Sequence, residues 1–340
     1  MADVAHRAGV SISTVSHVLN KTRTVAPATI QAVRNAIDEL GFTPNVLARA
    51  LVRAKTSTIG VALSAITNIY FGEVVRGMQS ECNRNGYFLF LTDTADHPDH
   101  QLEVIRALHE RRVDGMVLAH VPDPDNRAVR YLEKHQIPVV FVDRAIDGRF
   151  DQVLVENRKA TQRLVAHLAG HGHKRIGLVS GLQGLATTIE RIEGYQAGLK
   201  RAGLLFDEGI LEYGESEIDP ACQAVLRLLK LPRPPTAIIS ANNKMTLGVV
   251  RALKILGRRI PKDIAIAAFD DFEWADSFDP TLTALAQPCQ EMGIRAIKLL
   301  LRRIKAPQRK PVTMVLEPEL RIRHSCGCLG RPLSQDAPNS

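Results

Sequence analysis

Side chains suited to contacting DNA are concentrated between residues 11 and 23 of this 340-residue chain. Ile12, Ser13 and His17 could reach base edges, because an apolar side chain packs on a thymine methyl group and polar side chains hydrogen bond to bases. The neighbouring polar side chains are better suited to phosphate oxygens, which position a protein on DNA without specifying sequence: Thr14, Ser16, Asn20, Lys21 and Arg23. This pattern predicts a surface that reads duplex DNA.

A second group of polar and aromatic side chains follows apolar segments further along the chain. Asp143 and Asp270 each end a buried segment, where a carboxylate needs a partner such as a ligand hydroxyl or amine. Arg144 comes next to Asp143 and could bind a carboxylate or phosphate group. Tyr70 and Phe71 could stack on a ring, although core packing explains Phe71 equally well. These residues predict a site for a small organic molecule.

The five cysteines give only a weak indication of metal or redox chemistry. They are scattered, which favours a reducing compartment over a disulfide framework. Cys326-Gly327-Cys328 has no second pair of ligands near it in sequence, so we interpret it as part of a C-terminal tail. Gly170-His171-Gly172-His173 stands where a helix should end, and we interpret it as a glycine cap with solvated histidines. We therefore expect no metal ion and no cofactor.

Motifs and composition argue against an enzyme and against a membrane protein. The sequence has no GxGxxG after its first predicted strand, no GxxxxGK[ST] and no GxSxG. No apolar run approaches the roughly 18 residues that span a bilayer, and residues 1–7 lack the apolar core of a secretory signal. We expect a cytoplasmic, nucleoid-associated protein that is not an enzyme.

The distribution of charge supports a polyanionic partner. The formal net charge is +8, and residues 1–55 contain seven basic and three acidic side chains. Half of the positive excess therefore lies on a small part of the chain, as in proteins that bind nucleic acid. A basic segment by itself is nevertheless more often a solvated surface.

Three short helices are predicted to position the DNA-contacting residues. A helix over residues 2–8 stops at Gly9, which accepts the left-handed conformation, and Ser11 can cap the next helix over residues 12–20. A third helix begins at Pro27, and its inward stripe is Ile30, Val33, Ile37 and Leu40. Helix, short turn, helix is typical of a DNA-binding helix-turn-helix, and a three-helix bundle without a role in DNA binding is the alternative.

This segment resembles the LacI (lactose repressor) family. The matching runs are Asp3-Val4-Ala5-x-x-Ala8-Gly9-Val10-Ser11 and Thr14-Val15-Ser16-His17-Val18-Leu19-Asn20. The second run, extended to Arg23, is most similar to the purine-repressor branch, which has histidine where most members have arginine. The resemblance implies that the second helix enters the major groove of DNA. Family members also have a capping hydroxyl residue before the first helix, whereas only Met1 and Ala2 precede Asp3 here, so we expect the natural start to lie upstream.

Residues 45–53 could form a short helix, which is marginal in water by itself. In the resembled family this segment is the hinge helix, which pairs with its dimer mate in the minor groove. Leu51 matches the leucine that wedges between base pairs there and kinks the duplex. An ordinary linker is the alternative.

Strands alternate with helices from residue 57 onward, which predicts parallel sheets covered on both faces. The expected strands are 58–63, 87–91, 115–119, 139–142, 175–180, 237–240 and 264–269. The expected helices are 71–85, 99–112, 126–135, 158–169, 189–202, 220–229 and 244–256. The pattern restarts halfway, which predicts two lobes with a cleft, and ligands of such folds bind at the C-terminal ends of strands.

The phrases Arg191-x-x-Gly194-Tyr195 and Ile264-x-x-x-x-Phe269-Asp270-Asp271 resemble the periplasmic-binding-protein-like core of the LacI family. The implied fold is an all-α helix-turn-helix headpiece plus an α/β two-lobed core with two parallel, doubly wound sheets. Chain crossings are implied near Glu156, Ala286 and Val315. The expected domains are a helix-turn-helix (1–44), a hinge (45–56), a core (57–325, with an N-lobe of 57–156 plus 287–314 and a C-lobe of 157–286 plus 315–325) and a tail (326–340).

The resemblance adds three residues to the predicted effector site. Arg191 matches an arginine that faces the cleft in the family, and Thr187 is the same residue as in the purine repressor. Asn242 belongs to the pair Asn242-Asn243, where the family often has Asn-Asp. Two positions depart from the purine repressor: Leu185 replaces a base-contacting arginine and Ser216 replaces a cleft phenylalanine. We therefore expect a sugar, sugar acid or sugar phosphate as effector.

The resemblance finally implies a mode of action. A homodimer would bind a pseudo-palindromic operator in double-stranded DNA, and the effector would control that binding allosterically. The sequence after Ile322 has no leucine heptad of the kind that makes tetramers in this family, which favours a dimer. A solute-binding protein of the same core fold, without a DNA function, is the alternative, and the basic N-terminal segment argues against it.

Overall fold

The computed structural model describes residues 1–20, 23–42 and 55–328. The chain separates into two compact units, Met1–Thr56 and Ser57–Ser340. The predicted hinge over residues 45–53, with Leu51, and the predicted phosphate contact Lys21 lie outside the described residues.

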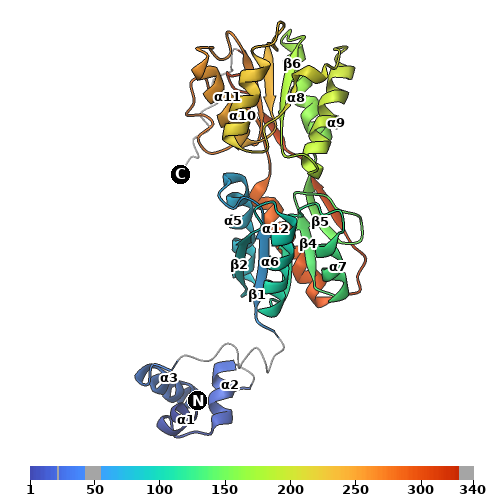
Figure 1. Ribbon diagram of the computed structural model, residues 1–340. Helices are drawn as coiled ribbons and strands as arrows, with labels where there is room; N and C mark the ends of the chain where they lie inside the picture. Colours follow the sequence, from blue (N-terminus) through green and yellow to red (C-terminus); the bar gives the residue numbers. More distant parts are fainter. Residues whose placement is uncertain (21–22, 43–54, 329–340) are drawn as a thin grey trace. The chain divides into compact units, whose positions relative to one another are not determined.

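The first unit contains three short helices (Figure 1): α1 (Ala2–Arg7), α2 (Ile12–Asn20) and α3 (Pro27–Glu39). Their bounds agree with the predicted helices to within one or two residues. Val4, Val15 and Val33 are fully buried where the three helices meet. Because this core is small, each of these valines contributes a large part of the apolar burial that holds the unit together.

The turn and the cap predicted between the first two helices are confirmed. Gly9 has φ +65°, the left-handed conformation that glycine adopts without strain. Ser11 Oγ accepts a hydrogen bond from Thr14 N at 3.1 Å at the start of α2. The placement of Leu40 in the buried stripe is wrong: this side chain is 47% exposed. The helix ends at Glu39, so Leu40 is already its cap residue and no longer follows the helical stripe.

The N-lobe of the second unit is built on a six-stranded parallel sheet with the order β11-β5-β4-β3-β1-β2. Its strands are β1 (Thr58–Leu63), β2 (Phe88–Asp93), β3 (Gly115–Leu118), β4 (Val139–Val142), β5 (Asp151–Val155) and β11 (Thr313–Leu316). Two pairs of helices cover opposite faces: α5 (Ile69–Arg84) with α12 (Cys289–Lys305), and α6 (Pro98–Glu110) with α7 (Arg127–Lys134). The helices α5 and α12 approach closely because Gly77 and Gly293 leave no Cβ between their backbones.

The C-lobe repeats this plan with the strand order β12-β10-β9-β8-β6-β7. Its strands are β6 (Ile176–Ser180), β7 (Leu211–Tyr213), β8 (Ala237–Ser240), β9 (Ala265–Phe269), β10 (Thr283–Ala286) and β12 (Glu319–Arg321). Its helices are α8 (Arg158–Gly170), α9 (Ala186–Arg201), α10 (Ile218–Leu228), α11 (Asn243–Ile255) and the short 3-10 helix η1 (Glu208–Ile210). The pair β10–β12 is antiparallel, which corrects the expectation of a wholly parallel sheet.

The chain passes between the two sheets three times within the described residues, after β5, after β10 and after β11 (Figure 1). The first and third passages run side by side, since Glu156 N donates a hydrogen bond to Leu316 O at 2.9 Å. Val315 still belongs to β11, so the third passage comes slightly later than the sequence implied. Most of β11 is exposed or half-buried, which leaves it with a weak apolar signal.

Candidate effector pocket and DNA-contacting surface

One pocket of the second unit is lined by residues of both lobes. All eight predicted effector residues are in its lining: Tyr70, Phe71, Asp143, Arg144, Thr187, Arg191, Asn242 and Asp270. In both lobes the lining comes mainly from the loops that follow strands and from the first two turns of helices. The parallel strands of each sheet bring these positions to one edge, so residues distant in sequence share one site. Their roles in binding stay predictions.

Asp143 and Asp270 occupy equivalent places in the two lobes. Asp143 directly follows β4 and Asp270 directly follows β9, and these strands hold the same position in the two sheet orders. Both residues have left-handed backbones, with φ of +67° and +72°. Such conformations are uncommon outside glycine and are frequent at ligand sites. The fold therefore directs one carboxylate from each lobe toward the pocket.

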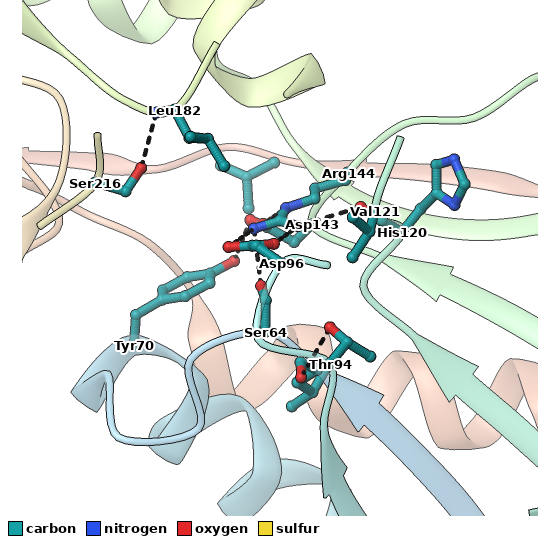
Figure 2. A network of polar contacts seen from close by, with 12 residues as sticks. Ser64, Tyr70, Thr94, Asp96, His120, Val121, Asp143, Arg144, Leu182 and Ser216 are labelled. Carbon is teal, nitrogen blue, oxygen red and sulfur yellow. Dashed lines mark hydrogen bonds and ion pairs between the residues drawn. The ribbon is translucent and has the colours of Figure 1, made fainter. Parts of the chain in front are cut away.

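The carboxylate of Asp143 is held by a neighbouring phenol. Tyr70 OH donates a hydrogen bond to Asp143 Oδ1 at 2.8 Å, as Figure 2 shows. Tyr70 is buried, and burial together with the nearby negative charge of Asp143 raises the pKa of its hydroxyl well above the usual range. The phenol therefore stays protonated and remains a donor at physiological pH.

The carboxylate of Asp270 lies deeper and is less well compensated. It accepts hydrogen bonds from Asn243 N at 3.3 Å and from Gln287 Nε2. Burial raises the pKa of Asp270, and the positive charge of Arg191 offsets this effect only in part. A ligand hydroxyl that donates to this carboxylate would compensate its charge, so Asp270 is suited to binding a polar ligand.

Arg144 is engaged by its own lobe. Its guanidinium pairs with Asp96, donates to Ser64 Oγ at 2.8 Å and donates to His120 O at 3.2 Å, as Figure 2 shows. Its Nε makes no hydrogen bond to any described residue and lies 3.7 Å from Asp143 Oδ2. An anionic ligand at this position would therefore compete with Asp96. Burial and the charge of Arg144 lower the pKa of His120 to about 4, so this imidazole is neutral.

Arg191 is fixed on the C-lobe side of the pocket. Its Nε donates to Asn157 Oδ1 at 2.9 Å, its Nη1 donates to Ala241 O, and its guanidinium carbon lies 3.7 Å from the ring centroid of Phe269. Stacking on an aromatic face orients a guanidinium without consuming its hydrogen bonds. Arg191 is therefore preorganised as a donor beside Asp270.

Asn242 has a structural role in addition to its place in the pocket. Its Oδ1 accepts from Met245 N at 2.7 Å and so caps α11, and its Nδ2 donates to Ser216 O at 3.3 Å. Thr187 lies in the first turn of α9 and is buried. Both side chains line the pocket, but the capping bonds of Asn242 leave it less capacity for a ligand.

Sequence reasoning did not select several residues that shape this pocket. Asn243 Nδ2 donates to Asn68 Oδ1 at 2.7 Å and so links the C-lobe to the N-lobe. Asp96 and Gln287 hold Arg144 and Asp270, respectively. The position of Asp96, shortly after β2, was an available signal because it is one more strand end. The contact of Asn68 with Asn243 had no signal, since 175 residues separate the two.

The predicted DNA-contacting residues that the structure describes lie on or next to α2. Ile12 is 54% exposed although it is apolar, and Ser13 is exposed beside it. Thr14, Ser16, His17 and Asn20 are half-buried, and Arg23 is exposed. Ser16 Oγ accepts a hydrogen bond from Asn20 Nδ2 at 3.2 Å. An exposed isoleucine at the capped end of a helix is suited to contacting an apolar group of a partner.

Outside the pocket, His167, His171 and Cys328 bring one potential ligand atom each within 4.8 Å of one another. Gly172 has φ +87°, as a glycine cap requires. The expectation of solvated histidines is only partly correct: His171 is exposed but contacts Cys328 Sγ, and His173 is half-buried with its Nδ1 3.0 Å from Thr236 Oγ1. Cys326 was predicted to belong to a C-terminal tail, but it is fully buried in the core of the C-lobe.

Within the described residues, no helix has the length and apolar character needed to cross a lipid bilayer.

Comparison with known proteins gives two family matches. Residues 1–45 match the model of bacterial regulatory proteins of the lacI family, and residues 165–326 match a periplasmic binding protein-like domain. Among curated proteins, the chain is similar to the HTH-type transcriptional repressor PurR of Vibrio vulnificus, with 39% identity over 324 residues, 94% of this chain and 96% of that protein. PurR of Vibrio atlanticus is 37% identical over 94% of this chain and 96% of its own length.

The solved structures that cover 95% of this chain and 98% of their own chains include the following two. One is the lac repressor dimer bound to operator and the anti-inducer ONPF, with a TM-score of 0.86 and 26% identity. The other is the complex of the transcriptional regulator CelR with cellobiose, with a TM-score of 0.74 and 29% identity.

Proposed function

The chain belongs to the LacI family of bacterial regulatory proteins, and we propose that its two units have different roles in repression. The first unit binds operator DNA, and the second binds the small-molecule effector that regulates this binding. The repressor acts as a homodimer on a pseudo-palindromic operator in the cytoplasm. It is a regulator and not an enzyme, in keeping with its repressor relatives.

The observation that carries this proposal is the origin of the pocket lining from both lobes. Tyr70, Asp143 and Arg144 come from the N-lobe, whereas Thr187, Arg191 and Asp270 come from the C-lobe. A ligand that contacts both lobes binds more tightly when the lobes are close together. Differential affinity of this kind is what shifts a conformational equilibrium, and it requires DNA and effector to affect each other's binding reciprocally.

The chemistry of the pocket favours a polyhydroxylated effector, a sugar or a related metabolite. Asp143 and Asp270 supply acceptors, Arg191 supplies donors, and the rings of Tyr70 and Phe71 supply an apolar face. Leu185 lines the pocket where the purine repressor carries a base-contacting arginine, which argues against a purine. A sugar acid or sugar phosphate is the second candidate, because Arg144 Nε has no hydrogen-bond partner among the described residues.

The effector class can be tested by thermal denaturation of the full-length protein with sugars, sugar acids, sugar phosphates and nucleobases. A ligand at 100 times its dissociation constant adds about 2.7 kcal/mol of stability and raises the thermal midpoint by several degrees. We expect a neutral or acidic sugar to give this shift, and Arg191→Ala to abolish it. A shift by nucleobases alone would contradict the proposed class.

DNA recognition is assigned to α2 and the residues that follow it. We propose that Ile12, Ser13 and His17 contact base edges and that the phosphate contacts come from the surrounding polar residues: Thr14, Ser16, Asn20, Lys21 and Arg23. Leu51 would act as the minor-groove wedge. His17→Ala should relax the preference at one or two base positions, where a specific contact is worth about 1–3 kcal/mol.

Selection from a random duplex library, with DNA bending measured on the selected sites, tests this assignment. The histidine control is His6→Ala, because His6 is exposed on α1 and outside the proposed surface. Leu51→Ala should reduce bending and operator affinity while effector binding is kept. An unchanged sequence preference of the His17 variant would remove the base-reading role from this residue.

A further inference from the structure

The end of α8 and the segment after β12 bring four potential metal ligands together, although neither segment takes part in the effector pocket. His167 and His171 are four residues apart at the C-terminal end of α8, so their rings lie on one face with centroids 4.9 Å apart. Cys326 and Cys328 lie beside these histidines although they are far away in sequence: Cys328 comes 157 residues after His171.

The distances within this cluster are short. Cys328 Sγ lies 2.9 Å from His171 Nε2, 3.4 Å from His167 Nε2 and 3.0 Å from Cys326 Sγ. The ligand atoms of His167, His171 and Cys328 all lie within 4.8 Å of one another, and Cys326 Sγ adjoins this group through its contact with Cys328 Sγ. Cys328 is the hub of the cluster, since it makes all three of these contacts.

The backbone holds the two cysteines in this arrangement. Gly327 has φ +87°, a conformation that suits glycine, and its N–H donates to His324 O at 3.1 Å. This turn brings the two sulfur atoms to one side. Cys326 is fully buried, and Thr283 Oγ1 donates a hydrogen bond to its Sγ at 3.1 Å. Such outer contacts orient ligands and are typical of metal sites.

We propose that His167, His171, Cys326 and Cys328 form a tetrahedral site for Zn²⁺ or a cation of similar ligand preference. Two thiolates and two imidazoles are the Cys2His2 ligand set of structural zinc sites, and the histidine spacing is among those found in such sites. The Cys-x-Cys spacing is one residue shorter than usual, and the glycine turn compensates for this difference. The site would join the C-terminal segment to α8 and so stabilise the C-lobe.

The observed spacing is compatible with a cation after a small expansion. Bond lengths of about 2.3 Å to sulfur and 2.0–2.1 Å to nitrogen imply tetrahedral edges of about 3.5–3.8 Å wherever one of the two ligand atoms is sulfur. The three contacts of Cys328 are shorter than these edges by less than about 1 Å. The partial negative charge at the C-terminus of α8 also favours a cation there.

Both cysteines can supply the sulfur ligands that this geometry requires. Thiolates are the metal-binding form of cysteine, and a bound cation would favour loss of the thiol protons of Cys326 and Cys328. The five cysteines are free thiols in the structure, so both sulfur atoms are available.

Cobalt binding to the full-length, reduced protein tests the site, because Co²⁺ occupies zinc sites and is coloured in them. We expect one Co²⁺ per chain, with thiolate-to-cobalt charge transfer and the intense visible absorption of tetrahedral coordination. Zn²⁺ should displace it with loss of colour and raise the thermal midpoint by several degrees. Absence of a coloured one-to-one complex with fully reduced thiols would overturn the proposal.

Variants locate the site. Cys328→Ser and His171→Gln should each weaken Co²⁺ binding by at least about 100-fold, since even outer-shell changes cost 10–100-fold. The matched controls are Cys222→Ala and His173→Gln, because both residues lie outside the cluster and should leave affinity unchanged. Undiminished binding by Cys328→Ser, or a Cys326–Cys328 disulfide in protein purified under reducing conditions, would contradict the proposal.

Discussion

In the N-lobe, Asp143 follows β4, shares its Oδ1 with the hydroxyl of Tyr70 and lies 3.7 Å from Arg144 Nε. In the C-lobe, Asp270 follows the equivalent strand β9 and accepts, among the residues that the structure describes, from the backbone N–H of Asn243 and the side-chain amide of Gln287. Burial raises the pKa of Asp270. The repeated fold thus supplies two carboxylates at the same backbone position. The side chains around each carboxylate determine how strongly a bound ligand would stabilise it.

The largest expected effect is on effector affinity when the two aspartates are neutralised separately. We expect Asp270→Asn to weaken binding of the effector by about 100-fold, because a charged hydrogen bond in a desolvated site is worth roughly 2–3 kcal/mol. Asp143→Asn should cost only about 10-fold, since Tyr70 already occupies one oxygen of Asp143. Calorimetric titration of both variants measures the difference. Equal losses would mean that the two lobes contribute alike.

The second prediction concerns the pH dependence of stability. The folded-state pKa of Asp270 lies above the ordinary value of 3.8, so this group stabilises the folded state at low pH and loses that contribution as pH rises through its folded pKa. The unfolding free energy should therefore contain a term that decreases with rising pH above about 4, by at most about 1.4 kcal/mol per pH unit.

Comparison with Asp270→Asn isolates this term, because other carboxyls act in the opposite direction. Asp263 has a pKa lowered by its hydrogen bonds with Arg259, so its contribution to stability is lost as pH falls. Denaturant unfolding of wild type and variant at several pH values should show their difference changing from pH 4 upward. A difference that is constant with pH would show that burial does not perturb Asp270.

The positions of both aspartates were predictable from sequence, whereas their environments were not. A buried apolar run followed by Asp marks a strand end, and all parallel strands of a sheet end at the same edge. The pairing of Arg144 with Asp96 and of Asp270 with Gln287 depends on side-chain packing between segments far apart in sequence. The same limit applies to His171 and Cys328: each belongs to a weak motif, and nothing in the sequence indicates that the two motifs lie side by side.

Elements were predictable where the apolar pattern was strong and uninterrupted. The bounds of α2, β1, β4 and β8 agree with the predicted ranges, and β4 and β8 are buried along their whole length. No prediction covered the long helix α12, although its buried residues recur at helical spacing. Short or half-exposed strands such as β7 and β11 carry too few buried residues to give a pattern.

The third prediction tests whether Tyr70 reduces the importance of Asp143. Tyr70→Phe removes the hydroxyl that donates to Asp143 Oδ1 and keeps the ring in the pocket. Loss of this buried hydrogen bond should lower stability by about 1 kcal/mol. It should also make Asp143 more important for ligand binding, so that Asp143→Asn costs more affinity in the Tyr70→Phe background. A double-mutant cycle in effector affinity measures this coupling, and a coupling energy of zero would contradict it.

The smallest effect is expected where the two lobes touch each other directly. Asn243 Nδ2 donates to Asn68 Oδ1 at 2.7 Å, and Asn68 Oδ1 also caps α5 by accepting from Tyr70 N at 3.0 Å. Asn243→Ala removes the link between the lobes and leaves the cap of α5 intact. Because one neutral hydrogen bond is worth about 0.5–1.5 kcal/mol, the effector should dissociate about 3-fold faster.

Stopped-flow dissociation of the effector measures this change, and Asn85→Ala, at the end of α5, serves as a control within one lobe. The dissociation rate is the informative quantity because a ligand held between two lobes leaves when they separate. A faster rate in the Asn243 variant with an unchanged rate in the control would place part of the closing energy in this contact. An unchanged rate in both variants would mean that the contacts of the ligand with the two aspartates, and not the contact between the lobes, hold the lobes closed.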